Sequence, residues 1–361
     1  MTLEPRPHAS ANPSATPRRP INLALQGGGS HGAFTWGVLD TLLADERLEI
    51  EGVSGASAGA VNAVALAHGF AQAQASGADG RVAARAALRS VWEAVIGLGS
   101  LGAIQSSLLK MVPGLDMPMS MMTGALNRLV SPYQSNPLDI NPLRSLLLQR
   151  IDFEAVSRLR QPRVFVSATQ VTTGKVEVFE GARLTLQAVM ASACLPMMFR
   201  AVEIDGQAYW DGGYSGNPAI TPLISQCATR DILLVQLSAL RRPQTPQTPA
   251  DIMDRISELT FNSSLLSQMR IIDFINRLLE KGRLSDAHYK HVLLHRIDGG
   301  EALAAYPVST KLSTDPAMIQ ALFELGQQAA QAWLNQHLRH LGVKSTVDIR
   351  QDYLDDMQLG F

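Results

Sequence analysis

Residues 51–63, EGVSGASAGAVNA, decide the fold and carry the first indication of function. An apolar run precedes the segment GASAG at 55–59, and helix-forming residues follow it. The pattern Gly-x-Ser-x-Gly predicts a strand, a sharp turn with Ser57 at its apex, and a helix. Gly55 and Gly59 suit so tight a turn. The N-terminus of the following helix would favour a developing negative charge beside Ser57. An ordinary turn of small residues fits the same letters, so the rest of the chain must decide.

A glycine-rich loop lies one strand and one helix upstream. Residues 21–25, INLAL, predict a buried strand, and 32–43 have apolar residues at helical spacing. A glycine loop between them would present backbone N–H groups at a helix N-terminus, which suits an anion. A Walker loop is excluded because its Gly-Lys-Ser/Thr ending is absent. The stretch 27–32 matches Gly-x-Gly-x-x-Gly, so a dinucleotide site stays open, although no clear second strand brings an acidic residue about 20 residues later. The nearby serine turn favours an oxyanion hole.

The remaining pattern predicts one α/β domain with a mostly parallel central sheet, because strands and helices alternate. An Asp-Gly pair between two short alternating runs at 201–210 predicts a hairpin. The other expected strands are 48–53, 163–169, 175–179, 231–237 and 291–297. The expected helices are 58–71, 81–96, 141–151, 152–159, 186–195, 251–284 and 315–341.

Three segments differ from this pattern. The proline-rich residues 1–20 predict a disordered arm, and 342–361 are expected to form a polar C-terminal tail. The domain is therefore expected to span 21–341. Within it, 97–137 are rich in methionine and poor in charge. Such residues suit either a lid or interfacial segment over an acyl pocket or a packed connection between helices.

Composition excludes several classes. Hydrophobic residues make up 46% of the 361 and charged residues 17%, with a net charge of -1, which argues against bulk binding to nucleic acid. The two cysteines are too few for a disulfide framework. The first 20 residues lack the apolar core of a secretory signal, and no strongly apolar run is long enough for a transmembrane helix. A cytoplasmic location is expected.

Four motifs in order resemble the patatin-like phospholipase family. They are GGGSHGAFTWGVL at 27–39, GASAG at 55–59, SACLPMMF at 192–199, and DGG at 211–213 followed by Asn-Pro. The resemblance extends over about residues 21–300. It implies a three-layer α/β/α sandwich and a lipid acyl hydrolase with a Ser–Asp dyad.

Transferred motif by motif, the resemblance implies a role for each site residue. Ser57 would be the nucleophile and Asp211 the general base, with Gly212 and Gly213 letting the chain pass close to the serine. The N–H groups of Gly27, Gly28 and Gly29 would form the oxyanion hole. Ser192 and Pro196 would shape the wall beside the dyad. One position departs from the family: His31 stands where Arg or Lys is usual, and it would supply either a hydrogen bond or a pH-dependent positive charge.

Besides the dinucleotide site, two other functions remain open at this stage. An α/β-hydrolase esterase would use a Ser-Asp-His triad, and His288, His291 and His295 follow Asp211 in the required order. A catalytically silent lipid-binding or scaffold protein is the other.

The resemblance implies an acyl-ester substrate, either a phospholipid, a neutral lipid or a storage polyester. It leaves open a peripheral contact with a membrane or lipid-droplet surface. Neither a cofactor nor a metal is expected, since no EF-hand loop or dense acidic cluster is present.

Overall fold

The computed structural model describes residues 18–109, 131–242 and 244–354. Its centre is an eight-stranded sheet in the order β5-β6-β3-β2-β1-β7-β8, with β4 paired to β3. Strands β3, β2, β1, β7 and β8 are parallel, and the pairings of β4, β5 and β6 are antiparallel. The strands are β1 Arg19–Leu25, β2 Leu48–Gly55, β3 Arg163–Gln170, β4 Val176–Phe179, β5 Val202–Ile204, β6 Gln207–Asp211, β7 Asp231–Gln236 and β8 Leu293–Asp298. The predicted mostly parallel sheet is confirmed.

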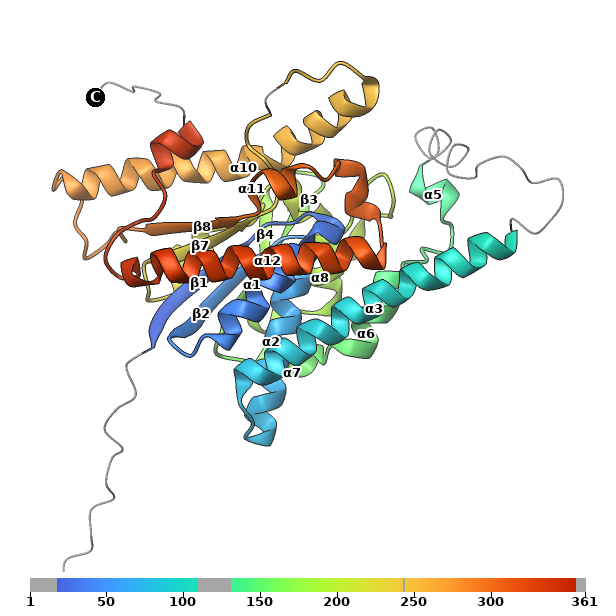
Figure 1. Cartoon of the computed structure of the whole chain (residues 1–361), viewed down its shortest axis with the longest axis horizontal. Helices are drawn as coiled ribbons and strands as arrows, with labels where there is room; N and C mark the ends of the chain where they lie inside the picture. Colours follow the sequence, from blue (N-terminus) through green and yellow to red (C-terminus); the bar gives the residue numbers. More distant parts are fainter. Residues whose placement is uncertain (1–17, 110–130, 243, 355–361) are drawn as a thin grey trace, which may run out of the picture.

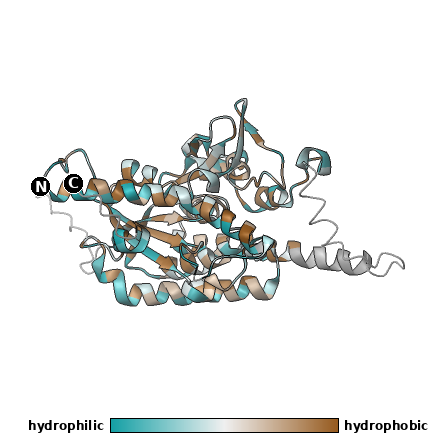
Figure 2. Cartoon of the chain, turned by 90° about the horizontal axis from the view of Figure 1, so that it is seen from above, coloured by the Kyte–Doolittle hydropathy of each residue, from teal (hydrophilic) through white to brown (hydrophobic). Residues whose placement is uncertain are grey.

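Helices cover both faces of the sheet and make three layers (Figure 1). Alternation along β1 shows why: Ile21, Leu23 and Leu25 enter one apolar core, and Ala24 enters the other. Figure 2 shows the hydrophobic strands between the helices. The first face is covered by α1 Gly32–Ala44, α2 Ala58–Ser76, α3 Gly80–Leu109, α6 Pro142–Arg150, α7 Phe153–Arg158, α8 Leu186–Ser192 and α12 Pro316–His337. The second is covered by α9 Thr221–Gln226 and α10 Pro249–Glu280, and the short helices α5 Pro132–Ser135 and α11 Gly300–Ala304 complete the set.

Helix α1 is buried on nearly all sides because α12 packs over it, as seen at the front of Figure 1. A Cβ on Gly37 of α1 would lie 1.9 Å from the carbonyl oxygen of Phe323 in α12. The two backbones can therefore approach each other only where a side chain is missing. The apolar character of residues 32–43 thus comes from burial on two sides.

Strand register brings the sequence motifs to one edge of the sheet. Leu25 at the end of β1 is paired with Gly55 at the end of β2, so the glycine loop and the serine turn begin at the same level. Gly55 is also paired with Val166 of β3, and Ala168, two residues further on, is paired with Asp211. The carboxyl edge of a parallel sheet is where such folds usually build their sites.

The ends of the chain differ in part from the expectation. Residues 1–17 of the expected arm and 110–130 of the methionine-rich segment lie outside the described residues, while Arg19 and Pro20 belong to β1. Part of the expected polar tail packs onto the sheet, because Val347, Ile349 and Tyr353 are buried in the second core. None of the described helices is long and apolar enough to cross a bilayer.

Candidate active site

The serine turn is strained. Ser57 has φ 53° and ψ -122° and immediately precedes α2. L-residues rarely adopt a positive φ, and such strain persists only where the surroundings enforce it. A Cβ on Gly55 would lie 2.4 Å from the carbonyl oxygen of Gly59, and one on Gly59 would lie 2.2 Å from that of Leu25. Both flanking glycines are therefore required by close backbone contacts.

Asp211 is held rigidly at the end of β6. It is fully buried, its N–H donates to the carbonyl oxygen of Cys194 (2.8 Å), and its own carbonyl oxygen accepts from Oγ1 of Thr169 (2.8 Å). Carboxylate oxygen Oδ1 accepts the Gly213 N–H at 2.7 Å. Gly212 passes so close to Ser167 that a Cβ on Gly212 would lie 2.0 Å from the carbonyl oxygen of Ser167. The Asp-Gly-Gly segment thus fixes both the backbone and one oxygen of the carboxylate.

The Asp211 carboxyl lies close to the Ser57 hydroxyl, and its second oxygen is unpaired. Burial raises the pKa of the Asp211 carboxyl to about 7, and the Gly213 N–H and the Ser57 hydroxyl oppose the rise. The hydroxyl is thus close enough to stabilise the carboxylate, yet Oδ2 has no hydrogen-bond partner of good geometry within the described chain. A fully buried, unpaired carboxylate oxygen is rare in folded proteins and is common at functional sites. The arrangement can accept a proton from Ser57.

The glycine loop is anchored at its first residue. The N–H of Gly27 donates to Oδ1 of Asn217 at 2.7 Å, so it is already engaged. Gln26 is buried, and its Oε1 accepts the N–H groups of Leu237 (2.7 Å) and Ser238 (2.8 Å). Among the described residues, the N–H groups of Gly28 and Gly29 have no such acceptor. Of the three N–H groups expected to form an oxyanion hole, that of Gly27 is therefore hydrogen-bonded within the chain, and those of Gly28 and Gly29 are available.

His31 does not provide a cation at neutral pH. Its side chain is 2% exposed, and burial together with the charge of Lys311 lowers its pKa to about 4. Its Nε2 is 2.8 Å from Oγ1 of Thr310. The residues 308–312 form η4, and a Cβ on Gly29 would lie 2.1 Å from the carbonyl oxygen of Lys311. His31 is thus a neutral anchor that ties the loop to η4, and the nearby basic side chain is Lys311, whose own pKa is lowered by burial.

The segment SACLPMMF contacts both Ser57 and Asp211. Oγ of the buried Ser192 accepts the N–H of Ser57 at 2.9 Å. Pro196 is half-buried in the turn after α8, and Met197 and Met198 are exposed behind it. Ser192 therefore holds the serine turn, while Cys194 holds Asp211 through its backbone.

Several supporting residues were missed by the sequence analysis or were given no role there. Asn217 holds Gly27 and also donates from its own N–H to Oγ of Ser264 in α10 (3.2 Å). Nε2 of Gln26 donates to Oδ1 of Asn262, also in α10, at 3.1 Å. Only Asn217 had a signal, in the Asn-Pro pair that begins four residues after the Asp-Gly-Gly motif. Thr310 and Lys311 had none.

The histidines of the alternative triad lie elsewhere. His295 is buried in β8, where Nε2 bonds Oδ1 of Asp231 (2.9 Å) and Nδ1 bonds Oγ1 of Thr346 (3.1 Å). His291 pairs with Glu280 at 3.1 Å. Within the described chain, no histidine has a recorded contact with Asp211. This geometry does not support a Ser-Asp-His triad.

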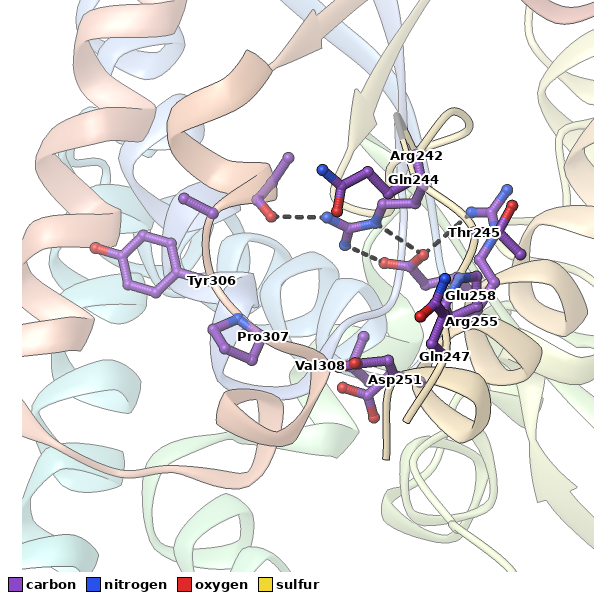
Figure 3. A pocket seen from close by; sticks show the side chains of 14 residues that line it. Arg242, Gln244, Thr245, Gln247, Asp251, Arg255, Glu258, Tyr306, Pro307 and Val308 are labelled. Atoms are coloured by element: carbon purple, nitrogen blue, oxygen red, sulfur yellow. Dashed lines mark hydrogen bonds and ion pairs between the residues drawn. The ribbon is translucent and has the colours of Figure 1, made fainter. Parts of the chain in front are cut away.

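A cavity of about 830 Å³ lies beside the loop that precedes α10, and neither Ser57 nor Asp211 lines it (Figure 3). In its wall, Arg242 and Arg255 both bond the carboxylate of Glu258, and Arg242 also donates to the carbonyl oxygen of Ala304. Arg242 thus connects α10 to α11, through its ion pair with Glu258 and its hydrogen bond to Ala304. The walls of this cavity are charged and are held together by ion pairs, which does not suit an acyl chain. No metal-binding cluster occurs in the described part of the chain.

A family model described as patatin-like phospholipase matches residues 23–224, which is more than half of the chain. The chain belongs to the patatin-like phospholipase family. All four motifs lie within the matched range, together with Ser57, Asp211, the glycine loop and Asn217. Membership of this family supports lipid acyl hydrolysis as the general activity.

Comparison with solved structures finds 12 similar chains. One is VipD from Legionella pneumophila, which is similar to this patatin-like phospholipase at 16% sequence identity and a TM-score of 0.43. The match covers 89% of this chain and 67% of VipD. We transfer no function at this level of similarity. Comparison with curated protein sequences finds no match.

Proposed function

We propose that this protein hydrolyses carboxylic ester bonds of phospholipids or related acyl esters through a Ser–Asp dyad. One observation carries the proposal: the carboxyl of the buried Asp211, whose Oδ2 is unpaired, lies close to the hydroxyl of the strained Ser57. A serine hydroxyl is a poor nucleophile until a base takes its proton. A carboxylate with an ordinary pKa near 4 is a weak base. The raised pKa of Asp211 makes it a better one near neutral pH.

The reaction has two halves. Oγ of Ser57 attacks the ester carbonyl carbon while Oδ2 of Asp211 accepts the hydroxyl proton. The tetrahedral intermediate then breaks its bond to the alcohol, which leaves with the proton from Asp211, and an acyl-serine remains. A water molecule next gives a proton to Asp211 and attacks the acyl-serine. The fatty acid leaves, and the proton returns to Oγ of Ser57.

The N–H groups of Gly28 and Gly29 are proposed to stabilise the oxyanion. Oxyanion-hole donors act because they already point at the developing charge, and each one contributes about 2.7–4 kcal/mol to catalysis. Support comes from the anchoring of the loop on both sides, by Asn217 at Gly27 and by Thr310 at His31. A loop fixed at both ends keeps its amides oriented without reorganisation.

A serine-reactive fluorophosphonate probe tests the nucleophile directly. We expect the wild-type protein to be labelled and Ser57→Ala to be unlabelled. Ser76→Ala is the matched control, since Ser76 is exposed at the other end of the same helix and bonds only its own helix backbone. Labelling of Ser57→Ala at the wild-type rate would rule out Ser57 as the nucleophile.

A silent lipid-binding or scaffold protein is the competing function. It would need neither the strain at Ser57 nor the unpaired oxygen of Asp211, and both are costly to maintain. Absence of labelling in the folded wild-type protein would favour it.

Comparison of products formed by the wild type and Ser57→Ala from mixed phospholipids, neutral lipids and polyesters would identify the substrate. A cytoplasmic location stays a prediction.

A further inference from the structure

Helix α10 has an exposed apolar face in addition to its buried one. Six large apolar side chains are between 40% and 58% exposed: Ile252, Met253, Ile256, Leu259, Ile271 and Phe274. At 3.6 residues per turn they fall on one side of the helix, opposite the buried Leu265, Met269 and Ile272. We call these six residues the outer face of α10. A helix that is apolar on both sides normally has a second apolar environment to meet.

The charges on α10 are sorted between its two sides. Glu258 is 4% exposed and is paired with Arg242 and Arg255, as Figure 3 shows. Asp273 is turned inward to Arg277 at 3.0 Å, with 13% of its side chain exposed. From 252 to 274, the exposed positions therefore carry no carboxylate, and the charged residue among them is Arg270. An apolar face with an arginine and no acid fits a surface of acyl chains and phosphates.

The same helix supports the candidate active site. Its Phe261 lies against Gly213, where a Cβ would be 1.9 Å from the ring. Asn262 and Ser264 bond Gln26 and Asn217, which anchor the glycine loop. Helix α10 runs along the top of the molecule in Figure 1. A surface that binds the outer face would thus be only one helix away from the dyad.

We propose that the outer face of α10 docks the protein on a phospholipid bilayer surface. The proposal rests on the proposed function, because a lipid acyl hydrolase must extract its substrate from such a surface. The outer face extends over 23 residues from Ile252 to Phe274, or roughly 33 Å of helix, in two apolar groups separated by the exposed Ser263 and Ser267. Apolar side chains at this spacing can enter the boundary between head groups and acyl chains while Arg270 meets the phosphates.

Vesicle flotation tests the docking without depending on catalysis. The protein would be the full chain with Ser57→Ala, and the vesicles phosphatidylcholine with a minor share of phosphatidylglycerol. We expect the variant with Ile256→Ser and Leu259→Ser to partition to the vesicles at least about tenfold more weakly, since two apolar side chains no longer enter the membrane. Val82→Ser is the matched control, because Val82 is an apolar residue on a different helix and is 63% exposed. It should bind like the parent.

A second pair, Ile271→Ser with Phe274→Ser, protects the test against misfolding of the first. Thermal unfolding would show that each variant is folded. Equal vesicle binding by the parent and both folded double variants would overturn the proposal, as would failure of the parent to bind. A dimeric parent that becomes monomeric in both variants would overturn it in favour of a second copy of the chain.

Failure of the proposed function looks different. If the wild type neither reacts with the fluorophosphonate probe nor releases fatty acid, the docking can still be measured, because it is scored on the Ser57→Ala protein. If the wild type is active, the outer-face variants should lose turnover of vesicle substrate about tenfold more than turnover of a soluble monomeric ester. Equal losses on both substrates would contradict docking.

Discussion

Two buried aspartates lie at strand ends in this protein, and they are bonded in opposite ways. Asp231 begins β7, and its Oδ1 accepts from both Nε2 of His295 and the N–H of Gly342, each at 2.9 Å. Asp211 ends β6, and its Oδ2 has no partner of good geometry in the described structure. Both are almost completely inaccessible to solvent. The difference is therefore not burial but whether the buried charge is compensated.

This comparison separates a structural carboxylate from the one that we propose as the general base. A buried charge is tolerated when hydrogen bonds or an opposite charge replace its lost hydration. The bonds of Asp231 do so and join β7, β8 and the segment after α12. Asp211 has only the Gly213 N–H and the Ser57 hydroxyl to offset its burial, and its pKa is raised to about 7. Its destabilised charge is what a base requires.

The largest expected effect is on activity. Asp211→Asn removes the proton acceptor and should lower kcat/KM on an acyl ester by about 10⁴-fold, the usual range for loss of a catalytic group. Asp231→Asn keeps the shape of its side chain and should lower it by less than about tenfold. The measurement is hydrolysis of a chromogenic ester by folded protein. Comparable losses in the two variants would remove the distinction between the aspartates.

The next effect is on stability. Asp231→Ala leaves His295 and the Gly342 N–H without their acceptor and should cost about 3–5 kcal/mol of unfolding free energy, as for other broken buried pairs. Urea titration followed by circular dichroism would measure it. A cost below about 1 kcal/mol would show that Asp231 contributes little to the fold.

Asp211→Asn should have the opposite effect on stability. The folded pKa of about 7 lies above the unfolded value of about 4, so folding is penalised by the raised pKa as pH rises from about 4 to about 7. Asparagine carries no charge and avoids the penalty. We expect a gain of up to about 4 kcal/mol near pH 8, which shrinks towards zero near pH 4. Thermal unfolding at both pH values checks it, and a gain that is independent of pH would be inconsistent with a buried charge.

The smallest effect is on the pH profile. Protonated Asp211 cannot act as a base, so kcat/KM should fall about tenfold per pH unit below about 7. His295→Gln should keep this acid limb and most of the activity, since His295 bonds Asp231 rather than Asp211. A shift or loss of the acid limb in that variant, with the fold intact, would favour a Ser-Asp-His triad over the dyad.

Much of the fold was predictable because it depends on local pattern. The alternating strands, the glycine loop and the serine turn follow from short-range periodicity and turn chemistry. The expected tail after 341 was less predictable, since Val347, Ile349 and Tyr353 are isolated apolar residues in a polar stretch. Their burial depends on a space beside β8 that the rest of the chain creates.

The candidate site divides in the same way. The sequence alone determined which residues carry the chemistry of the motifs, because Ser57 and its flanking glycines are required by the geometry of one turn. Only the tertiary structure decided how each group behaves. Asn217 accepts the N–H of Gly27, Thr310 and Lys311 contact the glycine loop from about 280 residues further along the chain, and Asp211 is buried away from solvent. Protonation and hydrogen bonding depend on neighbours in space, and those neighbours exist only once the chain has folded.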